Sequence, residues 1–410
     1  MAKLRVLLLT QWFDPEPTFK GLVFARELVR QGFEVEVLTG FPNYPGGAIY
    51  PGYRIKLLQR EVIDGVQITR VPLFPSHGQS VIGRILNYVS FSVSAFFYGV
   101  LGARHASVVY AYHPPLTVGI ASVFIKFFRR IPVLYDVQDM WPDTLRATGM
   151  LNSVMALRLV GRVCRWVYRR VDHIVVLSPG FRRLLVERGV PESKVSVIYN
   201  WADEASLAQI AGPLPAEYPL AKCYFRILFA GNMGKAQGLN SVLSAALLSQ
   251  LRGSRVRWVL LGSGVEVNAL KAEVAKKNLN NVVFLPAVPM AEVGSYLYEA
   301  DALLVHLRKD PLFQITIPSK TQAYMSAGKP LLMAVDGDAA DLVRLSEGGI
   351  VVESDNSEAL AIAADKLASM SDQDLARLGS NSKSYYKNHL GLVQGVRQFG
   401  RVFCQLAQFE

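Results

Sequence analysis

Near its start the chain reads LRVLLLTQWFDPEPTFKGLVFARELVRQGFEVEVLT, residues 4–39. Residues 4–10 form a continuous apolar run, which is typical of a parallel strand covered on both faces. Residues 21–30 carry apolar side chains at helical spacing, Gly32 follows where a helix would end, and residues 34–39 form the next apolar run. The stretch therefore predicts a strand–loop–helix–strand unit.

The same alternation runs through the rest of the chain. In the first half it predicts strands at 108–112, 132–137, 173–177 and 195–199, with helices at 116–128, 157–170 and 178–186. In the second half it predicts strands at 226–230, 257–261, 282–285, 302–306 and 330–334, with helices between them and from residue 340 onward. Such alternation is typical of α/β chains with doubly wound parallel sheets.

The pattern lapses between residues 200 and 222, where Pro213, Pro215 and Pro219 fall close together. A chain of 410 residues is also too long for a single core. We therefore expect two Rossmann-like domains, an N-terminal one over 1–205 and a C-terminal one over 223–390, joined by a linker over 206–222. Residues 391–410 are expected to form a helix that packs back on the N-terminal domain.

The chain is basic, with 44 Lys and Arg against 33 Asp and Glu, a formal net charge of +11. Zinc-finger spacing, RNP-like aromatic motifs and basic zippers are absent from the sequence, which argues against nucleic acid as a partner. An anionic membrane surface or a phosphate-bearing substrate fits the charge better, with plain solvated helix faces as the alternative. The isolated Cys164, Cys223 and Cys404 suggest neither a disulfide framework nor a zinc site, as in a cytoplasmic protein.

Residues 85–103 carry no charge and are flanked by Arg84 and Arg104. Their length could just span a bilayer, but interspersed Asn, Ser and Gly residues dilute the apolar character. A buried or membrane-docking helix is therefore the preferred interpretation, and a transmembrane helix the alternative. The apolar run at the N-terminus is too short for a signal peptide and leads directly into prolines.

Three glycine-bearing segments, two of them with lysines, follow predicted strands of the second half: FAGNMGKAQGL (229–239), LGSG (261–264) and ITIPSKTQAYMSAGKP (315–330). Glycines let backbone N–H groups approach an anion, and a lysine in the first turn of a helix can clamp a phosphate there. Tight turns without a ligand are the alternative. The segments lack the Walker GK[ST] ending, and GxGxxG is missing after the first strand, which argues against a nicotinamide enzyme.

Clustered carboxylates follow a predicted strand of the first half, in VLYDVQDMWPDT (133–144). Carboxylates that face one another raise each other's pKa and can serve as a base or bind a sugar hydroxyl. We take Asp139 as the candidate for such a role, while Asp143 equally fits a helix cap.

These motifs, with FDPEP (13–17) and LTGFPNYPGG (38–47), resemble the family 4 glycosyltransferases from end to end, and in particular the bacterial surface-polysaccharide branch with N-acetyl-L-fucosamine-type transferases. The resemblance implies the GT-B fold, two facing Rossmann-like domains with a cleft between them. It also implies a nucleotide-sugar donor on the second domain, an acceptor on the first, and no need for a metal or another cofactor.

The motifs and the resemblance together assign the site. Asp139 and Lys320 are the candidate catalytic residues. Acceptor contacts are expected at Gly21, His113, Asp136 and Trp141. Donor contacts are expected at Gly231, Asn232, Gly234, Lys235, Gln237, Gly262, Ser263, Gly264, Val288, Arg308, Thr316, Ser319 and Lys320.

Some positions depart from the family pattern. Asn232 and Gln237 stand where many members have Arg and Lys, and Thr316 and Ala323 stand where a pair of glutamates is common. Gln138 replaces a frequent histidine. Much of the usual charge of the donor site is therefore absent, and Lys320, Lys235 and Arg308 are the candidates to replace it.

The resulting prediction is a retaining transferase that moves a sugar from a UDP- or GDP-sugar to a lipid-linked saccharide in O-antigen, capsule or exopolysaccharide assembly. The sugar would be an N-acetylated deoxyhexosamine, and the protein would sit peripherally on the cytoplasmic face of the inner membrane. Two alternatives stay open. One is a nucleotide-sugar 2-epimerase, which needs no acceptor, and the other is a catalytically silent partner in a membrane polysaccharide-assembly complex.

Overall fold

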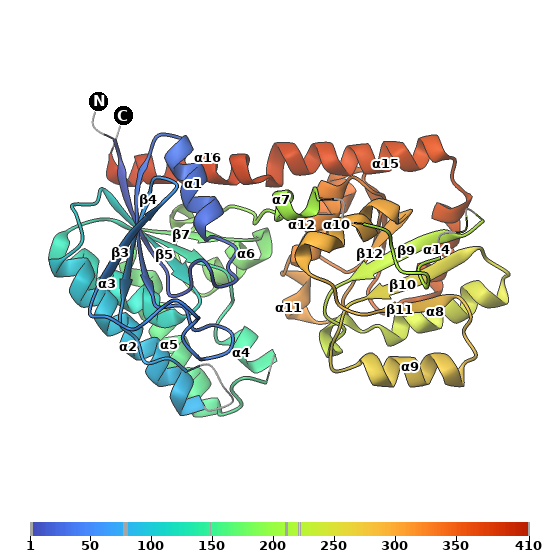
Figure 1. Cartoon of the computed structure of the whole chain (residues 1–410), viewed down its shortest axis with the longest axis horizontal. Helices are drawn as coiled ribbons and strands as arrows, with labels where there is room; N and C mark the ends of the chain where they lie inside the picture. Colours follow the sequence, from blue (N-terminus) through green and yellow to red (C-terminus); the bar gives the residue numbers. More distant parts are fainter. Residues whose placement is uncertain are drawn as a thin grey trace. The chain divides into compact units, whose positions relative to one another are not determined.

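A computed structural model describes residues 3–76, 81–147, 149–209, 212–219, 221 and 223–408 (Figure 1). The chain forms two compact units. Unit 1 comprises Met1–Tyr199 and Gly395–Glu410, and unit 2 comprises Asn200–Gln394. The segment 206–222, predicted as a linker, belongs to unit 2; residues 210, 211, 220 and 222 of it lie outside the described residues.

Unit 1 is built on a sheet with the strand order β3-β4-β2-β1-β5-β6-β7-β8. The bounds are β1 Arg5–Leu9, β2 Glu34–Gly40, β3 Gln59–Ile63, β4 Val66–Val71, β5 Val108–His113, β6 Val133–Val137, β7 His173–Val176 and β8 Val195–Val197. Neighbours pair in parallel except for the antiparallel β3 and β4. The sequence reasoning missed this hairpin. Its signal is the turn Asp64-Gly65, whose positive φ angles of 51° and 81° suit a two-residue hairpin turn.

Helices cover this sheet. Three of them form a row in which α2 packs on α3 and α3 on α5, and α16 brings Phe399 against Phe24 of α1, with ring centroids 5.4 Å apart. The bounds are α1 Leu22–Arg30, α2 Val81–Leu101, α3 Leu116–Arg129, α4 Asp143–Ala147, α5 Val154–Arg170, α6 Pro179–Glu187 and α16 Leu392–Ala407. Sequence patterns placed most of these helices within a few residues, because their buried stripes are regular.

Unit 2 has a sheet of parallel strands in the order β11-β10-β9-β12-β13-β14. The strands are β9 Phe225–Ala230, β10 Val256–Leu261, β11 Val282–Leu285, β12 Ala302–His306, β13 Leu331–Ala334 and β14 Gly349–Val352. The helices are α7 Glu204–Leu207, α8 Asn240–Leu251, α9 Val267–Lys276, α10 Met290–Glu299, α11 Pro311–Gln314, α12 Ser319–Ala327, α13 Asp338–Ser346, α14 Ser357–Ser369 and α15 Asp372–Tyr385. The predicted α/β class, with two Rossmann-like domains of parallel strands, is confirmed.

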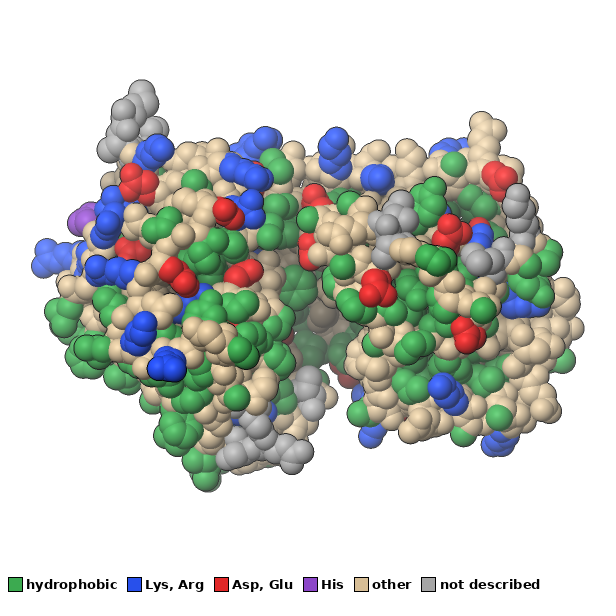
Figure 2. Space-filling view, in the orientation of Figure 1, with side chains coloured by type: hydrophobic (Ala, Val, Ile, Leu, Met, Phe, Trp, Pro, Cys, Tyr) green, Lys and Arg blue, Asp and Glu red, His purple; other side chains and the backbone are tan. Residues whose placement is uncertain are grey.

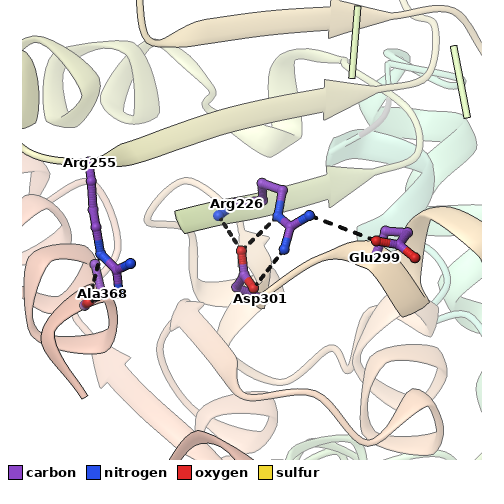
Figure 3. A network of polar contacts seen from close by, with 5 residues as sticks. All are labelled: Arg226, Arg255, Glu299, Asp301 and Ala368. Carbon is purple, nitrogen blue, oxygen red and sulfur yellow. Dashed lines mark hydrogen bonds and ion pairs between the residues drawn. The ribbon is translucent and has the colours of Figure 1, made fainter. Parts of the chain in front are cut away.

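Arginine side chains link the amino ends of the central strands of unit 2 to neighbouring elements, through ion pairs and through a hydrogen bond to a carbonyl oxygen (Figure 3). Arg226, at the start of β9, binds Asp301, which precedes β12, through Nε–Oδ2 at 2.8 Å and a second bond at 3.0 Å. Arg255, just before β10, donates from Nε to the carbonyl oxygen of Ala368 in α14 at 3.0 Å. These contacts hold the edge of the sheet opposite to the one where parallel α/β proteins bind ligands.

The aromatic contacts of α16 allow a test of how much this C-terminal helix contributes to the stability of unit 1. Phe399 is fully buried, with ring centroids 5.4 Å from Phe24 and 5.6 Å from Tyr110. Phe399→Ala should lower the free energy of unfolding of unit 1 by about 3–5 kcal/mol, because it leaves a cavity in a packed core. Denaturant unfolding measures this. The exposed Gln405→Ala on the same helix is the control, and an equal loss in both variants would contradict the packing.

Candidate functional site

Each sheet has one point at which the direction of strand addition turns. In unit 1 the chain adds β2 on one side of β1 and later places β5 on the other side; in unit 2 it adds β10 beside β9 and later β12 on the opposite side. Ligands of doubly wound sheets bind at the carboxyl ends of the strands at such a switch point. The loops after β1, β5, β9 and β12 are therefore where a site is expected.

Two glycine loops touch at this edge of unit 2. Gly231, after β9, and Gly262 and Gly264, after β10, have φ angles of 139°, 143° and 154°. A Cβ atom on Gly262 would lie 2.0 Å from the carbonyl oxygen of Gly231, and one on Gly264 2.3 Å from that of Met233. The N–H of Met233 donates to the carbonyl oxygen of Ser263 at 2.7 Å. Only glycine permits this close approach, so the two predicted loops form one continuous backbone surface.

Lys320 lies beside this surface. Its Nζ atom is 3.6 Å from the centroid of the Phe229 ring and 3.2 Å from the place a Cβ atom on Gly231 would take. Among the described residues Nζ has no hydrogen-bond acceptor, and burial lowers the pKa of this ammonium from 10.5 to about 7. A buried cation without an anion is unfavourable, so the position suits an anionic ligand.

Tyr324 fixes the helix that carries Lys320. Its hydroxyl accepts from the backbone N–H of Ala230 at 2.7 Å and donates to the carbonyl oxygen of the same residue at 3.2 Å. Ala230 ends β9 and precedes the first glycine loop. The two bonds therefore hold α12 at the strand end where the glycines begin.

The loop after β12 meets the same glycine loop. The N–H of Arg308 donates to the carbonyl oxygen of Ala236 at 3.0 Å. Nδ1 of His306, a buried residue, lies 2.6 Å from the carbonyl oxygen of Gln237, and burial lowers the pKa of its imidazole. Nδ1 must carry the proton, since a carbonyl oxygen only accepts. The sequence reasoning missed His306, although a polar residue that ends an apolar strand is a usable signal.

The other predicted donor residues lie on the same edge or near it. The side-chain oxygen of Gln237 accepts from the N–H of Gly234 at 3.0 Å, and the hydroxyl of Thr316 donates to the carbonyl oxygen of Leu312 at 2.8 Å. Val288 follows β11, which β10 separates from β9. Six of the predicted donor residues are exposed: Gly231, Asn232, Lys235, Ser263, Arg308 and Ser319.

In unit 1, Asp136 is held by internal hydrogen bonds, and its contact with the acceptor stays a prediction. Its side chain is fully buried and accepts hydrogen bonds from Nζ of Lys20, the hydroxyl of Tyr110 and Nε2 of Gln138, each at 2.5 Å. Lys20 is equally buried, with Nζ 4.7 Å from the centroid of the Phe399 ring. The carboxylate therefore joins the loop after β1 to β6 and faces no solvent.

His113, Asp139 and Trp141 gather where β5 and β6 end. The rings of His113 and Trp141 have centroids 5.0 Å apart at an interplanar angle of 78°. Burial lowers the pKa of His113 to about 3, so the ring is neutral, and its Nδ1 has no hydrogen-bond partner among the described residues. Burial also raises the pKa of Asp139, whose carbonyl oxygen accepts from the N–H of Trp141. The cluster offers a carboxylate and an imidazole nitrogen for hydroxyl groups.

Gly21 lies at the start of α1, at the end of the loop that follows β1. A Cβ atom there would lie 2.1 Å from Oδ2 of Asp14, which accepts from the N–H of Leu22 at 2.6 Å. Gly21 thus lets a carboxylate reach the helix N-terminus. Contact between Gly21 and an acceptor stays a prediction.

A buried polar network behind these loops was not singled out from the sequence. Glu16 accepts from the N–H groups of Asn43 and Tyr44 at 2.7 and 2.8 Å and from that of Phe13 at 3.2 Å. Burial raises the pKa of Glu16 to about 7, while the three N–H groups act in the opposite direction. Nδ2 of Asn87, in α2, donates to Oδ1 of Asn43 at 3.1 Å. The loops after β1 and β2 are therefore tied to α2.

A groove of about 580 Å³ adjoins Trp141 between α4 and α5. It is lined by Trp141, Pro142, Arg146, Val154, Leu157, Arg158, Gly161, Arg162, Cys164, Arg165, Tyr168 and Arg188. Across the described part of the chain, no group of three His, Cys, Asp or Glu side chains is placed to hold a metal ion.

Both halves of the chain match models of known glycosyltransferase domains. Residues 22–201 match the Glycosyl transferase 4-like domain, and residues 214–385 match Glycosyl transferases group 1. The chain is 25% identical to the probable glycosyltransferase WbjE of Pseudomonas aeruginosa, over 72% of this chain and 74% of that protein. It is 24% identical to WcaI of Escherichia coli strain K12, named as a colanic acid biosynthesis glycosyl transferase, over 81% of this chain and 84% of WcaI.

Solved structures share the fold. Sucrose-phosphate synthase from Thermosynechococcus elongatus superposes with a TM-score of 0.72 at 16% identity, over 100% of both chains. HepE of Anabaena, solved in complex with UDP-glucose, gives a TM-score of 0.67 at 16% identity, over 98% of this chain and 100% of HepE.

The shifted pKa of Lys320 predicts a pH dependence of stability. Since folding lowers this pKa from 10.5 to about 7, the unfolded chain binds more protons between these values, and the free energy of unfolding should rise with pH across that window. Lys320→Met removes the effect. The variant should exceed the wild type in stability most near pH 7, by on the order of a few kcal/mol, and the difference should narrow toward pH 10.

Denaturant unfolding at several pH values checks this. Lys276→Met, at an exposed lysine of α9, controls for the loss of a surface amine. A difference between wild type and Lys320→Met that does not change with pH would contradict a buried ammonium without an anion.

Proposed function

Both halves of the chain are glycosyltransferase domains, so the chain is a glycosyltransferase, and we propose that it transfers a sugar from a UDP- or GDP-sugar to a lipid-linked saccharide with retention of configuration. The observation that carries the proposal is the buried, unpaired ammonium of Lys320 beside two joined glycine loops at a switch point. The sugar proposed is an N-acetylated deoxyhexosamine, and the product an O-antigen, capsule or exopolysaccharide. The name of WcaI, which refers to colanic acid, supports polysaccharide assembly.

A nucleoside diphosphate suits the edge of unit 2. Its phosphates would supply the anion that Lys320 lacks, and backbone N–H groups of glycine loops can approach phosphate oxygens closely. Binding would raise the pKa of Lys320, because an opposite charge favours the ammonium. The UDP-glucose complex of HepE supports a nucleotide-sugar donor on this fold.

Glycosyl transfer releases the nucleoside diphosphate while positive charge develops at the anomeric carbon. Groups that stabilise the growing negative charge on the leaving oxygen therefore lower the barrier. In this proposal Lys320 and the glycine-loop N–H groups act on the leaving group. The reaction needs neither a metal ion nor a further cofactor in this scheme.

The acceptor is proposed to lie at the edge of unit 1. Asp139 would accept the proton of the acceptor hydroxyl or orient it, with His113 and Trp141 around it. A lipid-linked acceptor would bring the protein to the cytoplasmic face of the inner membrane as a peripheral protein, and nucleic acid would have no part.

Nucleotide binding tests the donor site first. Thermal unfolding is measured with UDP, GDP, ADP or no ligand at matched concentrations. A ligand present at about a hundred times its dissociation constant stabilises the folded state by roughly 2.7 kcal/mol, so UDP or GDP should raise Tm clearly. Lys320→Ala should lose most of this shift, while Lys276→Ala should keep it.

A panel without any nucleotide-induced shift would overturn the donor site and favour the catalytically silent partner. The absence of carboxylates at Thr316 and Ala323 is the observation behind that second candidate. Product analysis with donor alone separates the epimerase, since only an epimerase converts the nucleotide sugar without an acceptor.

Asp139→Asn tests the acceptor side. Because Asn cannot take up a proton, kcat should fall about 100-fold or more, measured as nucleoside diphosphate released with a prenyl-diphosphate-linked saccharide. The nucleotide-induced Tm shift should persist, since the proposed nucleotide site belongs to unit 2. Asp64→Asn, at an exposed turn, is the control, and equal rates for Asp139→Asn and wild type would remove Asp139 from the mechanism.

A further inference from the structure

We infer that the outer surface of α2, α3 and α5 in unit 1 docks on a lipid bilayer with anionic headgroups. The inference rests on the proposed function in one respect: a lipid-linked acceptor would bring the protein to a membrane. The surface itself is identified by its side chains. We call this surface the docking face.

The inner side of α2 packs against the rest of unit 1. Its buried residues, Asn87, Phe91, Ala95 and Gly99, are spaced by four and form one narrow stripe. Oδ1 of Asn87 accepts from Nε2 of Gln11 at 2.5 Å, and the hydroxyl of Ser92 donates to the carbonyl oxygen of Thr117 at 2.8 Å. By length and composition α2 could cross a membrane. A span would break these polar contacts, so the helix is expected to lie along the bilayer.

The outer side of α2 is apolar and exposed. Its side chains are 46% to 81% exposed at Ile82, Ile85, Leu86, Val89, Val93, Phe97 and Leu101. Figure 2 shows hydrophobic side chains gathered over this part of unit 1. Single exposed apolar side chains are common, but a contiguous patch of this kind marks an interaction surface.

Aromatic rings extend the patch from α2 to α3. Phe96 has ring centroids 5.9 Å from Phe124 and 5.7 Å from Phe128. Phe127 is 74% exposed and Phe128 57%. Two neighbouring helices therefore present one apolar area.

Positive charge borders the apolar area, and negative charge is missing from it. Helices α2, α3 and α5, all of them described, contain no Asp or Glu. Their basic residues are Arg84, Lys126, Arg129, Arg158, Arg162, Arg165, Arg169 and Arg170. Four of the arginines of α5 line a hollow of about 620 Å³ together with Trp166.

The basic and apolar areas meet at Trp166. Its ring centroid is 5.9 Å from that of Phe124, and the guanidinium of Arg170 lies 4.6 Å above the Trp166 ring. An apolar area with aromatic rings at its border and cations beside it is complementary to an anionic bilayer surface, where each Lys or Arg strengthens binding roughly fivefold. A second copy of the chain would place like charges together, so we commit to the bilayer.

Flotation of the full chain with vesicles tests the docking face. Vesicles of phosphatidylcholine alone are compared with vesicles of phosphatidylcholine mixed with phosphatidylglycerol. The protein should bind the mixed vesicles at least about tenfold more tightly, and added salt should weaken this binding.

Paired variants locate the contact. Arg162→Glu with Arg165→Glu should lower the affinity for mixed vesicles by about 25-fold or more, and Phe127→Ser with Phe128→Ser by about tenfold. Matched controls in unit 2 are Lys271→Glu with Lys276→Glu and Leu251→Ser with Val265→Ser, all at exposed positions. The controls should bind as the wild type does.

Equal binding to both kinds of vesicle, no binding, or equal losses in variants and controls would overturn the docking face. Self-association that the Phe127 and Phe128 variant abolishes would assign the face to a second copy and overturn it too. The nucleotide-induced Tm shift separates the two proposals. A shift without vesicle binding rejects the docking face alone, and vesicle binding without a shift rejects the donor site alone.

Discussion

The ammonium groups of Lys20 and Lys320 are both buried, but among the described residues only that of Lys20 has a carboxylate partner. In unit 1, Lys20 forms a buried ion pair with the carboxylate of Asp136 inside the protein. In unit 2, the Nζ atom of Lys320 lies 3.6 Å from the centroid of the Phe229 ring, and the quadrupole of one ring offsets only part of the cost of burying a cation. The paired ammonium of Lys20 links elements within unit 1, whereas the unpaired ammonium of Lys320 is available to an anionic ligand.

Parallel strand pairing determines the edge of the sheet at which an anionic ligand can bind. Because both central strands of unit 2 end at the same edge, the loop that carries Gly231 and the loop that carries Arg308 must meet. The glycines then determine how closely their backbones approach, since a Cβ atom on Gly262 would occupy the position of a neighbouring carbonyl group. The site is thus a product of topology first and of side chains second.

Sequence patterns predicted most strands, most helices and the loops that carry the donor residues, because apolar runs and glycine turns are local signals. They did not reveal hydrogen-bond partners that come from far along the chain. Asp136 lies in the same motif as Asp139, but its ion-pair partner Lys20 is more than a hundred residues earlier in the sequence. Glu16 was missed because burial and hydrogen bonds from Asn43 and Tyr44, which the sequence does not show, determine its surroundings. His306 had a local signal, a polar residue at the end of an apolar strand, but its contact with Gln237 comes from far along the chain. The hairpin of β3 and β4 was missed although its Asp-Gly turn is a local signal.

The placement of α16 has a consequence for how the chain is made. Unit 1 consists of Met1–Tyr199 and Gly395–Glu410, while unit 2 is the continuous segment Asn200–Gln394. Phe399 packs against Phe24 of α1, and Phe403 packs against Phe33 in the loop after α1. A nascent chain that has reached only the end of unit 2 therefore still lacks part of the core of unit 1. Domains usually complete folding in the order of synthesis. Here the ribosome starts unit 1 first and supplies its last core residues only after all of unit 2 has been translated.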